Sequence, residues 1–334
     1  MTTPPPSAEA AEPVTPAPAA QRPLGRSRTL GALLAVEWAR LRARPLVRAA
    51  AVAAALAALA AGIGTLAASH PDSPAHLHAL QAQQRQAIER CVTSGFNPPV
   101  SQVAQSDRRE FCANEAIPAP PYTFQLTSLL DLLEGAGGKG SAGPLVVVAL
   151  LLGASLVGAD WHSGQLATQL LWEPRRLRVL AAKVTVAAVA ITVGVLAAQA
   201  LLGAALLPAA LLRGSTAGAT AGWFGEVAGA ALRVAVLAGL AAGIGACLAS
   251  VGRRTAAALA TVAVYGLVEL FARGFENPTV ARWLLGENAA VFVTAGRAPA
   301  QLGRSTLAAL AILLAVAIGS FALAAASFLQ RDIT

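Results

Sequence analysis

Six runs of apolar residues dominate this chain, and each is long enough to cross a lipid bilayer. A helix needs about 20 mostly apolar residues to traverse the hydrocarbon core. The runs therefore predict an all-α integral membrane protein with six transmembrane helices. We expect these spans at residues 46–68, 143–160, 179–212, 227–250, 255–272 and 305–329.

The composition agrees with that class. Hydrophobic residues make up 56% of the chain and charged residues only 13%, whereas a soluble domain carries about 25% charge. Alanine and glycine are abundant, and small residues let membrane helices approach one another closely. A net charge of +8 could indicate nucleic-acid binding. In a membrane protein, however, Arg marks the cytoplasmic side, so we expect the lipid bilayer and no nucleic acid as a partner.

The segments between the spans complete the predicted layout. Residues 1–28 are rich in Pro and Ala, which predicts a disordered tail. The other segments are an interfacial helix at 29–45, an outer loop domain at 69–142, a second outer loop at 273–304 and a tail at 330–334. Fourteen Lys and Arg residues flank the spans on the side of the termini, against five in the opposite short loops. The excess predicts that both termini are cytoplasmic, and we expect a bacterial cell membrane.

The predicted interfacial helix has a charged residue on its apolar face. That face carries side chains at helical spacing, namely Leu30, Leu34, Trp38 and Leu41, which is typical of a helix lying in a membrane surface. Glu37 interrupts the face and is spaced to pair with Arg40. A plain basic flank to the first span is an equally good interpretation.

The large outer loop contains two of the three cysteines, Cys91 and Cys112, whereas Cys247 lies inside the fourth span. Two cysteines in one exported loop predict a disulfide, and two free thiols are the alternative. His70, His76 and His78 also lie at the start of this loop. Their spacing matches no known metal site, so we expect a solvated polar segment without a metal.

The stretch EGAGGKGSAG at 134–143 imitates phosphate-binding patterns without fulfilling either. Its G-x-G-x-x-G match has no strand before it, and Gly140 stands where a Walker A motif needs Ser or Thr after the Lys. A flexible lead into the second span is the better interpretation. The chain shows no catalytic constellation, so we expect no cofactor, and a transport subunit rather than an intramembrane enzyme.

Charges inside or beside the spans mark further candidates: Arg233, Glu226 and Glu269. A charge at membrane depth is costly and usually faces protein or water. Arg233 could reach outward toward Glu226, or it could line a substrate path. The same span carries two Gly-x-x-x-Gly pairs, beginning at Gly225 and Gly239, which permit close helix contact within a subunit or between two copies.

A mixed segment, ADWHSGQLATQLLWEPRRLRVLAAK at 159–183, separates two very apolar spans. Asp160 or Ser163 is placed to cap a helix, and Pro174 predicts its end. Leu166 and Leu170 share one face, and the opposite face presents Gln165, Thr168 and Trp172. We therefore expect a short surface helix within 161–178, on the cytoplasmic side.

Charged, glycine and proline residues follow one another along the chain in a characteristic order. They are Glu37, Asp160, Gly164 with Gln165, Pro174 with Arg175 and Arg176, Lys183, and Arg331 with Asp332. This layout resembles the membrane subunit of a type-2 ABC exporter, the ABC-2 permease family, without a fused ATPase. In that family a Glu-bearing interfacial helix precedes the first span, and an acidic residue with a Gly-Thr pair follows the second. A Pro-x-x-Arg-type turn then leads to a Lys at the third span. Asp160 and Gln165 depart from the usual Glu and Thr.

The resemblance implies that 161–178 is a coupling helix, which contacts a separate cytoplasmic ABC ATPase. The expected contact residues are Asp160, Gly164, Gln165, Thr168, Trp172, Pro174, Arg175 and Arg176, with Glu37, Trp38 and Arg40 on the interfacial helix. It also implies a second permease copy and export by alternating access. The apolar spans suit a small or amphiphilic substrate, although they suit any helix bundle. A membrane sensor or anchor, whose outer loop binds a ligand and whose cytoplasmic helix recruits a partner, stays open as the alternative.

Overall fold

The computed structural model describes residues 29–70, 74–94, 112, 123–135, 140–274, 278–296 and 304–330. The expected tail at 1–28 lies outside these ranges, and so does the C-terminal tail beyond Gln330, with Arg331 and Asp332. Within the ranges the secondary structure is helical, apart from an isolated bridge between Gln125 and Ser215.

The helices follow one another without any sheet in the described part of the chain. In order they are α1 (Leu30–Ala43), α2 (Pro45–Ala68), α3 (Pro74–Ser94), the 3₁₀ turn η1 (Leu126–Ser128), α6 (Leu129–Glu134), α7 (Ala142–His162), α8 (Gln165–Trp172), α9 (Arg176–Leu212), α10 (Ala221–Gly252), α11 (Thr255–Gly274), α12 (Pro278–Ala281), α13 (Leu285–Val293) and α14 (Thr306–Gln330). Six of them (α2, α7, α9, α10, α11 and α14) are long and apolar enough to cross a membrane. The predicted all-α membrane class is therefore confirmed.

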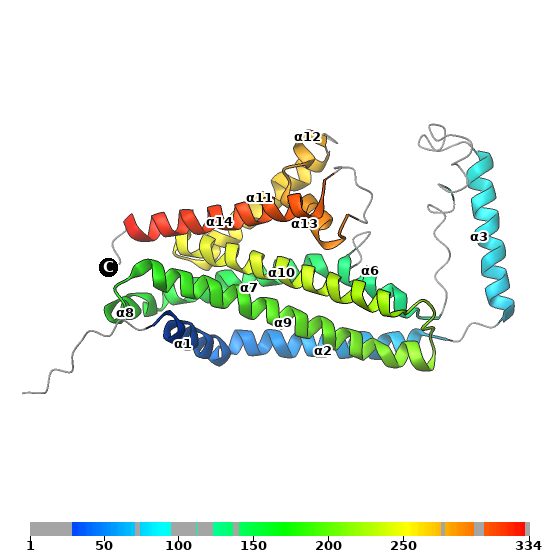
Figure 1. Cartoon of the computed structure of the whole chain (residues 1–334), viewed down its shortest axis with the longest axis horizontal. Helices are drawn as coiled ribbons and strands as arrows, with labels where there is room; N and C mark the ends of the chain where they lie inside the picture. Colours follow the sequence, from blue (N-terminus) through cyan, green and yellow to red (C-terminus); the bar gives the residue numbers. More distant parts are fainter. Residues whose placement is uncertain are drawn as a thin grey trace, which may run out of the picture.

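Helix α10 forms the centre of the bundle. Of its most apolar stretch, 72% is buried, against 6% for that of α11. It packs against α7, α9 and α14, and Figure 1 shows it running between them. Because α10 is enclosed on several sides, its small residues set how closely its neighbours can lie.

Glycines fix the distance between α10 and α7. A Cβ added to Gly153 of α7 would lie 2.0 Å from the carbonyl oxygen of Ala242. One added to Gly245 of α10 would lie 2.3 Å from the carbonyl oxygen of Leu150. Both distances are far inside van der Waals contact, so the two backbones touch where these glycines stand.

The two Gly-x-x-x-Gly pairs of α10 have different surroundings. A Cβ on Gly239 would meet Thr192 Oγ1 of α9 at 2.1 Å, and one on Gly243 would lie 3.7 Å from Val184. A Cβ on Gly225 would meet nothing within 4 Å. The pair that begins at Gly239 is therefore a contact within one subunit, whereas Gly225 brings no helix close.

The bundle has two unlike ends (Figure 1). At one end lie α1, α8 and the last turns of α14, and we name it the α8 end. At the other end lie α6 and, apart from the bundle, α3, and we name it the α6 end. The stretch expected as a second outer loop, 273–304, includes α12 and α13, and α13 buries Val291, Phe292 and Val293. It is thus partly helical and packed, because it carries an apolar run of its own.

Candidate functional site

Three charged side chains meet in the interior at the α8 end. Lys183 of α9 places its Nζ 3.0 Å from Glu37 Oε2 of α1 and 2.5 Å from Asp160 Oδ2 of α7. Their side chains are only 3%, 8% and 5% exposed, respectively. Buried charges persist in proteins when they are paired and hydrogen-bonded, and each carboxylate here has the same cation as its partner. We name these three residues the charge cluster.

Polar side chains surround the charge cluster and satisfy its remaining oxygens. Gln169 of α8 donates its Nε2–H to Glu37 Oε1 over 2.6 Å. Arg44 donates to Asp160 Oδ1 and, over 2.7 Å, to the carbonyl oxygen of Leu156. Arg40 lies 3.3 Å from Glu37, which confirms the expected pairing. Glu37 is therefore held at once from α1, α8 and α9.

The orientation of α1 explains why Glu37 is buried. The buried residues of this helix are Leu33, Glu37 and Leu41. Leu30, which the sequence placed on the apolar face, is 51% exposed. Leu30 lies two turns before Glu37 on the same side of the helix, so the face that packs on the bundle begins at Leu33.

The charge cluster leaves no room for a substrate. A cavity beside it has a volume of about 20 Å³ and is lined by the cluster itself with Leu156 and Val186. That volume holds about one water molecule. The cluster is consequently suited to joining helices rather than to binding a ligand.

Helix α8 begins differently from what the sequence predicted. Its N-cap is Gly164, which has φ +67°, a conformation that glycine adopts without strain. Neither Asp160 nor Ser163 caps the start of α8: α7 continues to His162 and Ser163 is its C-cap, so Asp160 lies inside α7 and faces Lys183. Asp160 was also expected to contact a partner protein, but it is 3% exposed, because its carboxylate is engaged within the subunit.

Helix α8 has one face packed on the bundle and one face open. Leu166 is buried in an apolar cluster with Leu180 of α9 and Phe328 of α14. On the opposite face Leu171 is 84% and Trp172 72% exposed. The other exposed residues of the segment include Gly164, Gln165, Thr168, Pro174 and Arg175. Arg176 is half-buried and donates to the carbonyl oxygen of Phe328 over 3.3 Å.

Two residues of α8 were not predicted from the sequence to be functional. Gln169 was not singled out, although its buried amide joins α8 to Glu37. Leu171 was not singled out either, although it extends the exposed apolar patch of Trp172. The spacing Leu166, Gln169 and Leu170 on one helical face was a usable signal for Gln169, since a polar residue on a packed face usually has a partner.

A second ion pair lies toward the α6 end. Arg233 of α10 pairs with Glu134 of α6 at 3.4 Å and donates its Nε–H to the carbonyl oxygen of Val293 over 2.8 Å. Glu226, the partner considered from the sequence, is exposed. Glu269 stands near the end of α11 and pairs with Arg273 at 2.7 Å. Arg233 thus ties α10 to α6 and α13.

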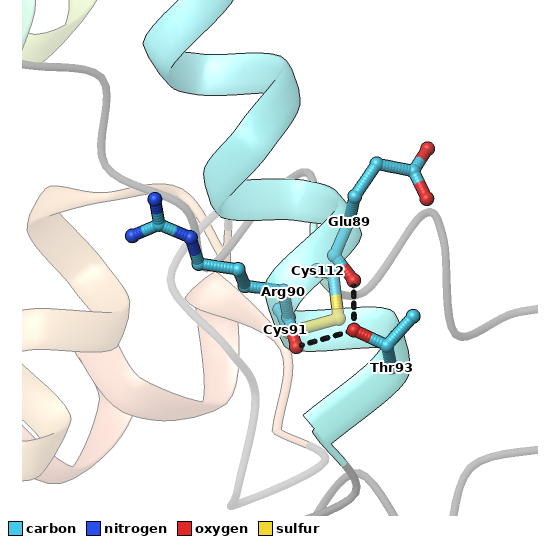
Figure 2. Close-up of a disulfide and its surroundings, with 5 residues drawn as sticks. All are labelled: Glu89, Arg90, Cys91, Thr93 and Cys112. Carbon is cyan, nitrogen blue, oxygen red and sulfur yellow. Dashed lines mark hydrogen bonds between the residues drawn. A yellow bond between two sulfur atoms is a disulfide. The ribbon is translucent and has the colours of Figure 1, made fainter.

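The predicted disulfide is confirmed. Cys91 at the end of α3 is bonded to Cys112, which is fully buried, while Cys247 is free. Figure 2 shows the bond beside the last turn of α3, where Thr93 donates to the carbonyl oxygen of Glu89 over 2.7 Å. His70 and His78 are exposed, and the side chain of His76 lies outside the described part. No group of three metal-ligating side chains occurs among the described residues.

Comparison with known proteins gives no match for this chain: no family model, no curated protein and no solved structure resembles it closely enough to be counted. A functional assignment must therefore start from the charge cluster, from α8 and from the order of residues along the sequence.

Proposed function

We propose that this chain is the membrane subunit of an ATP-driven exporter of the ABC-2 class. The observation that carries the proposal is the sharing of Glu37 between Gln169 of α8 and Lys183 of α9. It joins a short surface helix to a membrane-spanning helix through buried polar contacts. A subunit driven by a separate motor protein needs a joint of this kind.

The open face of α8 supports a protein partner. Leu171 and Trp172 lie side by side in the sequence and are mostly exposed. Exposed apolar patches often mark interaction sites, and Trp is enriched among the residues that dominate binding energy. Gln165 and Thr168 supply polar groups at the rim of the same face. The proposed partner is a cytoplasmic ABC ATPase that docks on this face.

The charge cluster offers a route from α8 to the spans. A displacement of α8 moves the Gln169 amide, which lies 2.6 Å from Glu37. Glu37 is bound to Lys183 of α9, and Lys183 is bound to Asp160 of α7. Helix α1 leads directly into α2 at Pro45. A push on α8 therefore reaches α2, α7 and α9 together, which suits a rigid-body rocking of helices between two states.

The charge distribution supports the proposed orientation. The α8 end includes most of the Arg residues that flank the spans, and such residues favour the cytoplasmic side. We place both termini in the cytoplasm of a bacterial cell and the α3 segment outside it. Two copies of the permease and two ATPase subunits would form the working unit, and a small or amphiphilic substrate would leave the cell by alternating access.

Co-purification tests the proposal. The tagged full-length chain is isolated from its native membrane, and a stoichiometric ATPase is the expected companion. Trp172→Ala removes the centre of the open face and should reduce ATPase recovery by more than about tenfold. Trp283→Ala is the matched control, because Trp283 is 69% exposed, close to the 72% of Trp172, and lies on the connection between α11 and α13.

Two outcomes would refute the proposal. Recovery of a kinase or a sigma-type regulator in place of an ATPase would establish the sensor or anchor alternative. Undiminished transport by the Trp172→Ala and Gly164→Ala variants, with the ATPase still bound, would separate α8 from coupling.

A further inference from the structure

Gln199 is a polar side chain without a partner in the interior of the bundle. It lies near the middle of α9 and is 4% exposed. Neither its amide nitrogen nor its amide oxygen has a hydrogen-bond partner within the described part of the chain. A polar group enclosed among apolar helices is costly, and in a membrane helix such residues usually mark a functional path. The charge cluster does not use Gln199.

The neighbours of Gln199 place it in the seam between α9 and α10. One turn toward the α8 end, Val195 belongs to an apolar cluster with Val234 of α10. One to two turns toward the α6 end, Leu202 and Leu206 belong to a second cluster with α10. Gln199 therefore interrupts an otherwise apolar seam between the two clusters.

Helix α6 covers this seam on the side of the α6 end. Leu129 and Leu133 of α6 are buried in the second cluster, with Leu206. A Cβ added to Gly203, one turn beyond Gln199, would already lie 3.6 Å from Leu129. The same cluster includes Trp223, whose indole nitrogen is also buried without a partner among the described residues.

Among the described residues, polar contacts near its two ends hold α6 in place. Glu134, at its last residue, pairs with Arg233 at 3.4 Å. At the start of η1, the backbone of Leu126 donates to the carbonyl oxygen of Ser215 over 3.0 Å, and the backbone of Ser141 donates to the carbonyl oxygen of Leu132 of α6 over 2.7 Å. Gly135 ends the helix with φ +79°. A six-residue helix that is fastened at its two ends can leave the seam without unfolding any span.

We propose that Gln199 lies on the path of the cargo through this subunit and that α6 is the plug over the outer end of that path. The Gln199 amide donates to and accepts from the polar group of an amphiphilic cargo, and the Glu134–Arg233 pair keeps the plug closed. The proposal rests on the proposed export function and assigns that function a polar contact in α9.

Thiol labelling tests the path. Gln199→Cys and Val195→Cys are made in a Cys247→Ala background, where Cys91 and Cys112 stay bonded and unreactive. A small membrane-impermeant methanethiosulfonate is added from outside to the full chain in proteoliposomes. We expect Gln199→Cys to react at least about tenfold faster than Val195→Cys, although both positions are buried here. Equal rates, or no reaction at either position, would overturn the proposal.

A second pair of variants tests the plug. Glu134→Gln removes the ion pair and should speed the labelling of Gln199→Cys about fivefold. Asp131→Asn is the matched control, because Asp131 is an exposed carboxylate on the same helix, and it should leave the rate unchanged. Equal rates in the two variants would overturn the role of α6.

The labelling result is independent of the test of the proposed function. It requires neither the ATPase nor an identified substrate. If no ATPase binds α8, the difference in labelling rate between Gln199→Cys and Val195→Cys can still be measured. If that difference is absent, an ATPase can still co-purify with the chain. The two proposals can therefore fail separately.

Discussion

Replacement of Lys183 by Met should destabilise the folded subunit strongly. Met keeps the length of the side chain and removes the only cation that touches both Glu37 and Asp160 within the described residues. The two carboxylates are buried, so they would face each other without the charge that separates them. The charge cluster would then hold two carboxylates and no cation of its own, with only the more exposed Arg40 and Arg44 as charged partners.

The magnitude follows from the contact distances. At about 3 Å and an effective dielectric constant of about 20, each contact of Lys183 is worth about 5 kcal/mol before desolvation. Desolvation offsets much of this, and removal of one partner from a buried pair costs about 3–5 kcal/mol. Arg44 still holds Asp160 and Gln169 still holds Glu37, so we expect a loss of about 3 kcal/mol, at the lower end of that range.

Unfolding of the purified protein in detergent measures this loss. Arg40→Gln is the matched control, because Arg40 also pairs with Glu37 but is 45% exposed, and such pairs contribute about 0–1 kcal/mol. The combined variant Glu37→Gln, Asp160→Asn, Lys183→Met removes every charge of the cluster and should regain much of the lost stability. Equal losses for Lys183→Met and Arg40→Gln, or no recovery in the combined variant, would refute the reasoning.

Two further predictions concern the α3 segment and the core of the bundle. Cys91→Ser opens a disulfide between residues 21 positions apart and should reduce the stability of the loop by about 3 kcal/mol; limited proteolysis should then cut the α3 segment faster and leave the bundle intact. Gly153→Val places a side chain where a Cβ would lie 2.0 Å from the carbonyl oxygen of Ala242, so α7 and α10 must separate. Size-exclusion chromatography should then show loss of monodisperse protein. Gly143→Val, at an open position on the same helix, is the control and should elute normally.

The sequence predicted well those features that depend on neighbouring residues or that offer a single choice of partners. Each span is set by its own apolar run, so hydropathy is sufficient to find it. The disulfide was predictable because Cys91 and Cys112 are the two cysteines in the long polar segment between the first two spans. Glu37 and Arg40 are three positions apart on one helix, so their contact follows from helix geometry.

The charge cluster was beyond such arguments because its partners are far apart in the chain. Glu37 and Lys183 are separated by 146 residues. Helical periodicity shows which side chains share a face of one helix, but it does not show which other helix that face contacts. Glu37 was therefore interpreted as an interruption of an apolar face, whereas it is the most connected residue of α1. The cap assignment failed for a related reason: Asp160 has the residue type of a cap, but its contact with Lys183 keeps it inside α7.

The continuity of α9 links the charge cluster to the proposed path. Lys183 and Gln199 are 16 residues apart on one helix, or about 24 Å at 1.5 Å per residue, and Pro208 lies beyond both. Between them, Thr192 is pressed against Gly239 of α10, so α9 cannot bend away at this level without parting from α10. A shift of α9 that starts at Lys183 must therefore reach Gln199, and it must do so by sliding or rotating α9 along the seam in which Gln199 lies. The same contact predicts the effect of a larger residue at Gly239. Such a residue would separate α9 from α10 and expose Gln199 without any movement of α8.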